Sequence, residues 1–228
     1  MKSLETIIID YLENYPPSLE LFQRLKQAGN LYLIGGVLRE YRDKGAIQDL
    51  RDIDIIIDIS RRSIWEGILE TYRPKRNNFG GYKLVCSALI VDIWPLEETW
   101  AYREGYVVCI PEEYVQSLPE TVFLNLDAIV YDFNGDIWYD EKYLDAMNRR
   151  VIDVVLEKNP RILLNILRAM VLKKRYGMRF SDGLRKILRE QMEQESDLAG
   201  KLLEIQEKRY RKEILSGEEI EKELEGLR

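Results

Sequence analysis

Residues 31–58 read LYLIGGVLREYRDKGAIQDLRDIDIIID, and this stretch decides the fold class. A short apolar run ends at Gly35-Gly36, a helical segment follows, and a second apolar run contains Asp52 and Asp54. Side chains alternate between the two faces of a strand, so these aspartates would place two carboxylates on one face while the isoleucines beside them enter the core. The stretch therefore predicts a strand, a short helix and a second strand that carries two acids.

The two carboxylates form a candidate metal site. Adjacent carboxylates repel and raise each other's pKa unless a divalent cation lies between them. Ligands that are all oxygen favour a hard cation such as Mg²⁺ or Mn²⁺, which can bridge a carboxylate to a substrate phosphate. Gly35 and Gly36 would let the backbone approach a triphosphate closely, and the helix beginning near Val37 would offer free N–H groups to an anion.

Both features also have purely structural explanations. An Asp-x-Asp pair can be a solvated alternation at a strand edge, and a glycine pair can be an ordinary turn. The residues beside Asp54 are isoleucines at 53 and 55–57, so the strand is expected to be buried. Buried carboxylates need a partner. The metal-site interpretation supplies that partner.

The motifs Gly-Gly-x-x-Arg-Glu at 35–40 and Asp-Ile-Asp-Ile at 52–55 resemble the signature of the DNA polymerase β-type nucleotidyltransferases. Within that superfamily, the likeness is to the head domain of class II CCA-adding enzymes and bacterial poly(A) polymerases. Leu38 and Glu40 stand where that family has valine and aspartate. Later segments extend the resemblance to about Tyr176.

The resemblance implies an α+β (mixed α/β) fold in two parts. Residues 1–150 would form a nucleotidyltransferase head, in which a mixed β-sheet packs on helices and two further helices precede the sheet. Residues 151–228 would form an all-α, neck-like domain.

Hydrophobic periodicity locates the other elements. Apolar residues three and four apart predict helices over 3–14, 18–28, 60–72, 160–176, 181–193, 196–215 and 218–228. Alternation predicts strands over 31–34, 82–87 and 89–93. Asn134-Gly135 predicts a turn between a strand over 121–133 and another at 136–140.

The resemblance also implies further site residues. The superfamily's third acidic residue lies on a neighbouring strand, completes the metal site and can accept the proton of the attacking hydroxyl. Asp92 occupies that position, although an exposed aspartate at a strand end is the alternative. Arg39, Asn125 and Arg168 match positions of the family's motifs and are expected to bind the nucleotide. Lys83 follows a second glycine pair and would bring a positive charge near the phosphates, although a plain hairpin turn explains that pattern equally well.

Two departures from the family concern specificity. Glu120-Thr121 replace an Arg-Asp pair that contacts the sugar and phosphates in the family. Arg161, Ile162 and Asn165 replace the E-D-x-x-R residues that template cytosine and adenine. Because the apolar side chain of Ile162 cannot hydrogen-bond to a base, addition of CCA is not predicted.

The composition narrows the chemistry. The 228 residues are 46% hydrophobic, enough to fill a core, and include no histidine, which removes Ser-His and Cys-His nucleophilic catalysis. Cys86 and Cys109 lie in apolar segments without metal-type spacing, so buried, reduced thiols are expected and a zinc site is not. No apolar run approaches the roughly 20 residues that a bilayer requires, and the acidic N-terminus does not resemble a signal peptide. A cytoplasmic protein without membrane partners is expected.

Charge is distributed unevenly along the chain. The net charge is −6, with about −8 over residues 1–150 and about +2 over residues 151–228. Tight non-specific binding to nucleic acid is not expected, because it requires clustered Lys and Arg. Contact with RNA would therefore use the C-terminal helices, where basic residues cluster at 173–175, 185–189 and 208–212. The alternative is that these basic residues form solvated faces of the helices and do not contact RNA.

These residues predict a Mg²⁺-dependent nucleotidyltransferase that transfers NMP from an NTP to a hydroxyl and releases pyrophosphate. The acceptor is left open between an RNA 3′ end, a protein side chain and a small molecule. The departures at Glu120, Thr121, Ile162 and Asn165 also fit a degenerate family member that binds a nucleotide or a partner protein without catalysis.

Overall fold

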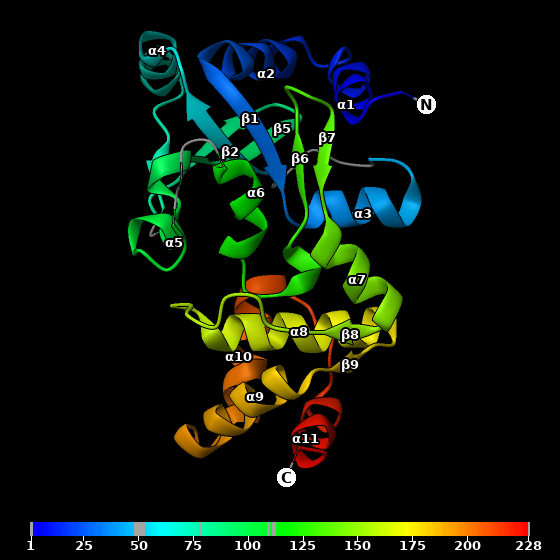
Figure 1. Ribbon diagram of the computed structural model, residues 1–228. Helices are drawn as coiled ribbons and strands as arrows, with labels where there is room; N and C mark the ends of the chain where they lie inside the picture. The colour runs from blue at the N-terminus through cyan, green and yellow to red at the C-terminus, as the bar shows by residue number, and fades with distance from the viewer. Residues whose placement is uncertain (1, 48–52, 78, 109, 111–112, 228) are drawn as a thin grey trace. The chain divides into compact units, whose positions relative to one another are not determined.

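The computed structural model describes residues 2–47, 53–77, 79–108, 110 and 113–227 (Figure 1). The chain forms two compact units. The first contains Met1–Thr121 and Asp127–Glu141, and the second contains Val122–Leu126 and Lys142–Arg228. The division into domains at residue 150 stays a prediction, since the compact units divide earlier, after Glu141. Among the described residues, no helix is long and apolar enough to cross a membrane.

The first unit is built on a seven-stranded mixed sheet. In spatial order its strands are β3 (Lys75–Arg76), β4 (Tyr82–Cys86), β5 (Leu89–Pro95), β2 (Ile53–Ile59), β1 (Gly29–Ile34), β6 (Val130–Asp132) and β7 (Ile137–Tyr139). Strands β2 and β5 pair in parallel, and the other neighbouring pairs are antiparallel. The predicted mixed sheet is confirmed, as is the hairpin of β4 and β5.

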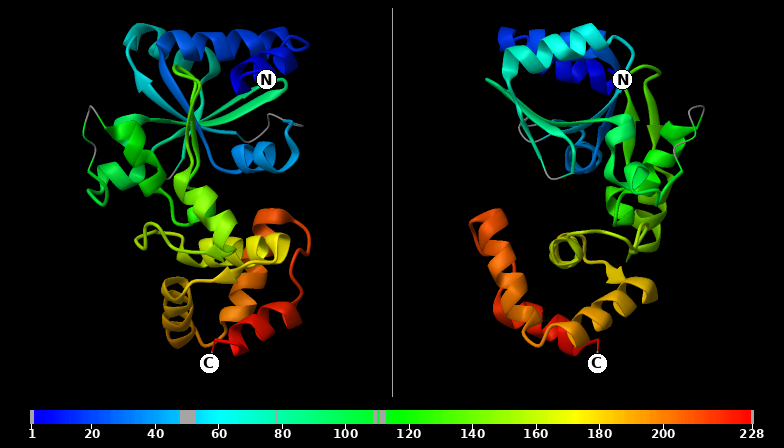
Figure 2. Two further views of the ribbon diagram at one scale, coloured as in Figure 1. Left: turned by 45° about the vertical axis from the view of Figure 1, so that its right-hand side comes forward. Right: turned by 90° about the vertical axis from the view of Figure 1, so that its left-hand side faces the viewer.

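Helices cover one face of this sheet (Figure 2). They are α1 (Leu4–Leu12), α2 (Pro16–Ala28) and α4 (Arg62–Tyr72), and α2 contacts α1, α4, β1 and β4. The two prolines that interrupt the helical pattern are the first residues of α2, where a missing N–H costs no helical hydrogen bond. Helix α3 (Gly36–Lys44) follows β1 directly.

The other face of the sheet is partly covered by short helical segments. These are η1 (Leu96–Glu98), α5 (Trp100–Arg103), α6 (Tyr114–Ser117) and η2 (Leu118–Thr121). They contribute to an apolar cluster that contains Tyr32, Ile56, Leu96, Tyr102, Leu118 and Val130. Strand β2 therefore sends its odd-numbered isoleucines to the helix-covered face, and its even-numbered residues to this second face.

The segment 121–133 is not a single strand, and that prediction is wrong. Only Val130–Asp132 forms strand β6, and Asn125–Asp127 forms a short 3-10 helix, η3. The side chain of Asn125 donates to the carbonyl of Val151 and accepts from the backbone N–H of Asp153, both at 3.0 Å. These bonds tie the first half of the segment to the second unit instead of to the sheet.

The second unit is mostly helical. Its elements are α7 (Glu141–Arg149), β8 (Val151–Ile152), α8 (Ile162–Tyr176), β9 (Arg179–Phe180), α9 (Asp182–Gln194), α10 (Leu198–Tyr210) and α11 (Gly217–Glu225). The sequence did not indicate α7, β8 or β9. The helix predicted over 196–215 ends at Tyr210, because Arg211 is left-handed and the Gln206 amide binds the backbone of Ile214 and Leu215.

Gly29 offers a test of the β1–β2 pairing. A Cβ at Gly29 would lie 2.0 Å from the backbone oxygen of Asp58, so Gly29→Ala must separate the two strands. We expect it to lower the free energy of unfolding by about 3 kcal/mol in urea denaturation. Gly45→Ala is the control, because Gly45 has a positive φ but nothing within 4 Å, and should cost only about 1 kcal/mol. Equal costs would contradict the close packing of β1 on β2.

Candidate active site

Asp54 and Asp92 are direct neighbours across the parallel strands β2 and β5. The register partners on either side of them are fully or almost fully buried: Ile53, Val91, Ile55 and Ile93. The two aspartates are half-buried on the opposite face of the sheet. Neighbouring strands lie about 4.8 Å apart, so the two carboxylates share one small volume. The structure thus brings together two of the three predicted metal ligands.

The third predicted ligand, Asp52, lies outside the described residues. Within the part of the chain that is described, no group of three potential ligands from Asp, Glu, Cys and His is close enough to hold a metal ion. Cys109 is likewise outside the described residues, whereas Cys86 is a buried, free thiol as expected. The metal site is therefore supported by a pair of carboxylates.

Gly35 packs against Asp54 at the start of α3. Its φ is +79°, and a Cβ at this position would lie 3.2 Å from Asp54 Oδ2. Glycine avoids both the backbone strain and the contact with the carboxylate. Gly35 is also the N-cap of α3 and provides no side-chain cap, so Gly36 and the next residues begin a helix whose first N–H groups have no partner within the helix. The predicted helix start is confirmed, while the binding of phosphates by the glycine pair stays a prediction.

Lys83 lies next to Asp92 on the neighbouring strand of the sheet, on the same face as the two aspartates. It is the register partner of Asp92 on β4, and its Nζ lies 2.9 Å from Asp92 Oδ2. Lys75 on β3 is in turn the register partner of Lys83. A row of residues on one face thus reads Asp54, Asp92, Lys83, Lys75 across four adjacent strands. The predicted positive charge of Lys83 therefore lies at the carboxylate pair, while its contact with phosphates stays a prediction.

Arg39 forms a buried ion pair with Asp127 of η3. The exposed fractions of the two side chains are 10% and 7%. A Cβ at Gly36 would lie 3.6 Å from an Arg39 Nη atom, so the guanidinium lies beside the first turn of α3. The pair fixes the start of α3 to the segment that leads into β6. The direct contact of Arg39 with a nucleotide stays a prediction.

Asn125 and Arg168 lie in the second unit. Asn125 is buried and its side-chain amide binds the backbone of residues 151 and 153, which gives it a structural role. Arg168 is half-buried on α8. A contact of either residue with a nucleotide stays a prediction.

The residues that depart from the family motifs have local roles. Thr121 donates its hydroxyl to the carbonyl of Leu118 within η2. Asn165 is buried and donates to the carbonyl of Arg161 at 3.3 Å. Ile162 lines an open, mainly apolar cavity of about 460 Å³ together with neighbouring residues of α8 and with α10. An apolar surface of this kind offers no hydrogen-bonding edge to a base.

Sequence analysis missed one polar network near the site. Asp58, four residues after Asp54 on the same face of β2, accepts a 2.6 Å hydrogen bond from the Tyr114 hydroxyl. Burial raises the pKa of the nearby Tyr32 phenol, and the charges of Tyr114, Asp132 and Asp58 raise it further. Tyr32 is therefore protonated at neutral pH. The residues involved are too far apart in sequence for any local pattern to connect them.

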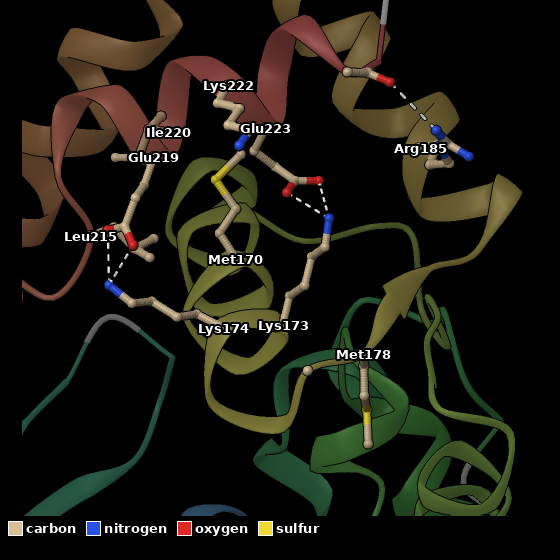
Figure 3. A pocket seen from close by; sticks show the side chains of 12 residues that line it. Met170, Lys173, Lys174, Met178, Arg185, Leu215, Glu219, Ile220, Lys222 and Glu223 are labelled. Atoms are coloured by element: carbon tan, nitrogen blue, oxygen red, sulfur yellow. Dashed lines mark hydrogen bonds and ion pairs between the residues drawn. The ribbon is translucent and has the colours of Figure 1, made fainter.

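The second unit contains a cavity of about 630 Å³ between α8, α9 and α11 (Figure 3). Lys173 donates to both carboxylate oxygens of Glu223 at 2.5 Å, and Lys174 Nζ lies 2.7 Å from Glu219 Oε1. The hydrogen bond from Lys174 lowers the pKa of the Glu219 carboxyl. Two lysines of a predicted RNA-contacting cluster are thus paired with carboxylates, which reduces the positive charge that phosphates would meet. RNA binding here stays a prediction.

The fold of this chain is that of CCA-adding enzymes and tRNA nucleotidyltransferases, as the sequence resemblance implied. A CCA-adding enzyme in an apo form matches 99% of this chain and 54% of its own, with a TM-score of 0.62 and 17% identity. A tRNA nucleotidyltransferase solved with a primer tRNA and an incoming ATP analogue matches 91% of this chain and 60% of its own, with a TM-score of 0.59 and 15% identity. The Thermotoga maritima CCA-adding enzyme, solved with tRNA, matches 83% and 46%, with a TM-score of 0.53 and 19% identity.

This chain therefore spans about half the length of the solved enzymes that it resembles. No protein-family model and no curated protein matches the sequence. At such identities the likeness establishes the fold.

The structural role of Asn125 can be separated from a nucleotide contact. Asn125→Ala removes one donor and one acceptor used by backbone groups that are buried or partly buried, so we expect it to lower the free energy of unfolding by about 1–3 kcal/mol. Urea denaturation measures this cost, with exposed Asn148→Ala as the control. If Asn125→Ala instead leaves stability unchanged and weakens nucleotide affinity, the structural role is contradicted.

Proposed function

We propose that the chain is a Mg²⁺-dependent nucleotidyltransferase that transfers NMP from an NTP to a hydroxyl group. The observation that carries this proposal is the pairing of Asp54 with Asp92 beside Gly35 and the first turn of α3. Two carboxylates next to a glycine-capped helix start can serve a cation and the phosphates that it accompanies. The fold of the similar solved enzymes supports the same class of reaction.

Each residue would have a separate task. The N–H groups at the start of α3 would bind the triphosphate, and Gly35 would leave room for it. Asp92 would accept the proton of the attacking hydroxyl while the hydroxyl oxygen bonds to the α-phosphorus. The bond from the α-phosphorus to the β-phosphate oxygen breaks, and pyrophosphate leaves with the electron pair.

The donor set fits the metal that the fold family implies. Asp54 and Asp92 provide carboxylate oxygens on one face, and these are the ligands that Mg²⁺ and Mn²⁺ prefer. Asp52 would be a third ligand. When bound there, the ion would supply Lewis-acid stabilisation of the negative charge on the reacting phosphates.

Similar enzymes have been solved with tRNA and with an ATP analogue, which supports an RNA 3′ end as the acceptor and ATP among the substrates. The buried ion pair of Arg39, the backbone bonds of Asn125 and the altered residues at 120–121 favour, as a second candidate, a member that binds nucleotide without catalysis.

The metal and nucleotide site can be tested by thermal shift. Mg²⁺ with an NTP should raise the melting temperature of the wild type by mass action, and Asp54→Asn should abolish most of that shift. Asp58→Asn is the matched control, because Asp58 lies on the same strand and face but takes part in the Tyr114 hydrogen bond. If Asp54→Asn shows the full increase in melting temperature with Mg²⁺ and an NTP, the metal and nucleotide site lies elsewhere.

Replacement of Asp92 tests whether this residue acts in catalysis or in nucleotide binding. If Asp92 accepts the proton, Asp92→Ala should leave NTP affinity within a few-fold and lower pyrophosphate release by about 10²–10⁴. Exposed Glu97→Ala, just after β5, should keep wild-type activity. Undiminished activity per folded Asp92→Ala molecule would remove Asp92 from the chemistry.

A wild type that binds nucleotide but releases no pyrophosphate with RNA, protein or small-molecule acceptors would favour the non-catalytic candidate.

Base choice follows from the surroundings of Ile162. Because Ile162 lines an apolar cavity and Asn165 is bonded to its own helix, we expect either weak discrimination among the four NTPs or a preference other than CTP followed by ATP. Incorporation can be followed on a tRNA that lacks its 3′ end. Ordered addition of C, C and A would contradict this expectation.

A further inference from the structure

Lys83 already occupies the position of a cation at one of the two carboxylates. Its Nζ lies 2.9 Å from Asp92 Oδ2, and the two residues face each other directly across β4 and β5. Asp54 is the next residue in the same register. The lysine therefore compensates the negative charge of the aspartate pair within the protein itself.

The ion pair is accessible, which argues against a role in holding the fold together. The side chain of Lys83 is 42% exposed and that of Asp92 is 22% exposed. Exposed pairs of this kind contribute little to stability. A lysine ammonium lies on a flexible four-carbon stem, so Lys83 can leave Asp92 without any movement of strand β4.

We propose that Lys83 is a built-in counter-ion of this site, which a divalent cation displaces from Asp92 and which then pairs with the phosphates of the incoming nucleotide. This inference rests on the proposed function, because it takes Asp54 and Asp92 as the metal ligands. It adds that metal and nucleotide act on Lys83 in opposite ways. The free cation competes with the ammonium, whereas the phosphates attract it.

If Lys83 is a displaceable counter-ion, its replacement affects the binding of the free cation and of the metal–nucleotide complex in opposite directions. A structural ion pair would not have this effect. Removal of the Lys83 charge should tighten the binding of a free divalent cation and weaken the binding of a metal–nucleotide complex. A purely structural ion pair would change both affinities in the same direction, or neither.

The chain contains a matched control for the loss of charge. Lys75 is the register partner of Lys83 on the next strand and is exposed. Among the described residues it forms no ion pair. Lys75→Met removes the same charge from the same row of residues, but not from the carboxylate. Lys83→Arg retains the charge and tests for rescue.

Mn²⁺ is the probe, and the paramagnetic resonance signal of the free ion reports its binding without any need for catalysis. We expect Lys83→Met to bind Mn²⁺ about 5-fold tighter than the wild type or more, and Lys75→Met and Lys83→Arg to stay within about 2-fold. With Mn²⁺ and the unreactive analogue α,β-methylene-ATP, Lys83→Met should bind the complex about 5-fold more weakly.

Three outcomes would overturn the proposal, and they can be told apart. Equal changes in Lys83→Met and Lys75→Met would assign the effect to general charge. Unchanged or weaker Mn²⁺ binding by Lys83→Met, with binding abolished in Asp54→Asn, would remove the role of Lys83 and leave the metal site in place. Absence of Mn²⁺ binding by every protein would overturn both this inference and the proposed function.

Discussion

Two like charges are held side by side in the middle of the sheet, and the arrangement around them follows from this constraint. Asp54 and Asp92 are register partners on the parallel strands β2 and β5, while the residues before and after each of them are buried on the other face. The repulsion between the carboxylates must be offset. Lys83 offsets it on one side through the ion pair with Asp92, and Gly35 leaves space on the other. Replacing either neighbour would change the charge or the volume of the site.

Sequence analysis could predict this centre because its signals are local. The alternation around Asp54 and in the β4–β5 hairpin identified the strands, and the glycine pair indicated the helix start that now lies against Asp54. The pairing of Asp54 with Asp92 could be expected only from the family resemblance. Spacing within one strand does not say which strand will be its neighbour.

What the sequence could not provide depends on contacts between distant residues. Arg39 pairs with Asp127, which is 88 residues away, and no periodicity connects them. The segment 121–133 has the composition of a strand, but the amide of Asn125 binds the backbone of residues 151 and 153 and holds its first half outside the sheet. Lys75 belongs to a two-residue strand, too short to produce an alternating pattern. In each case a tertiary hydrogen bond or strand pairing overrode the local signal.

The central claim is that Asp54 and Asp92 hold a divalent cation together. Anomalous diffraction from a crystal grown with Mn²⁺ and an unreactive ATP analogue tests it most directly. The account predicts an anomalous peak bonded to carboxylate oxygens of both residues at about 2.0–2.3 Å, with Lys83 turned away from Asp92 and toward the phosphates. A peak that contacts neither aspartate, with the Lys83–Asp92 ion pair intact, would contradict it.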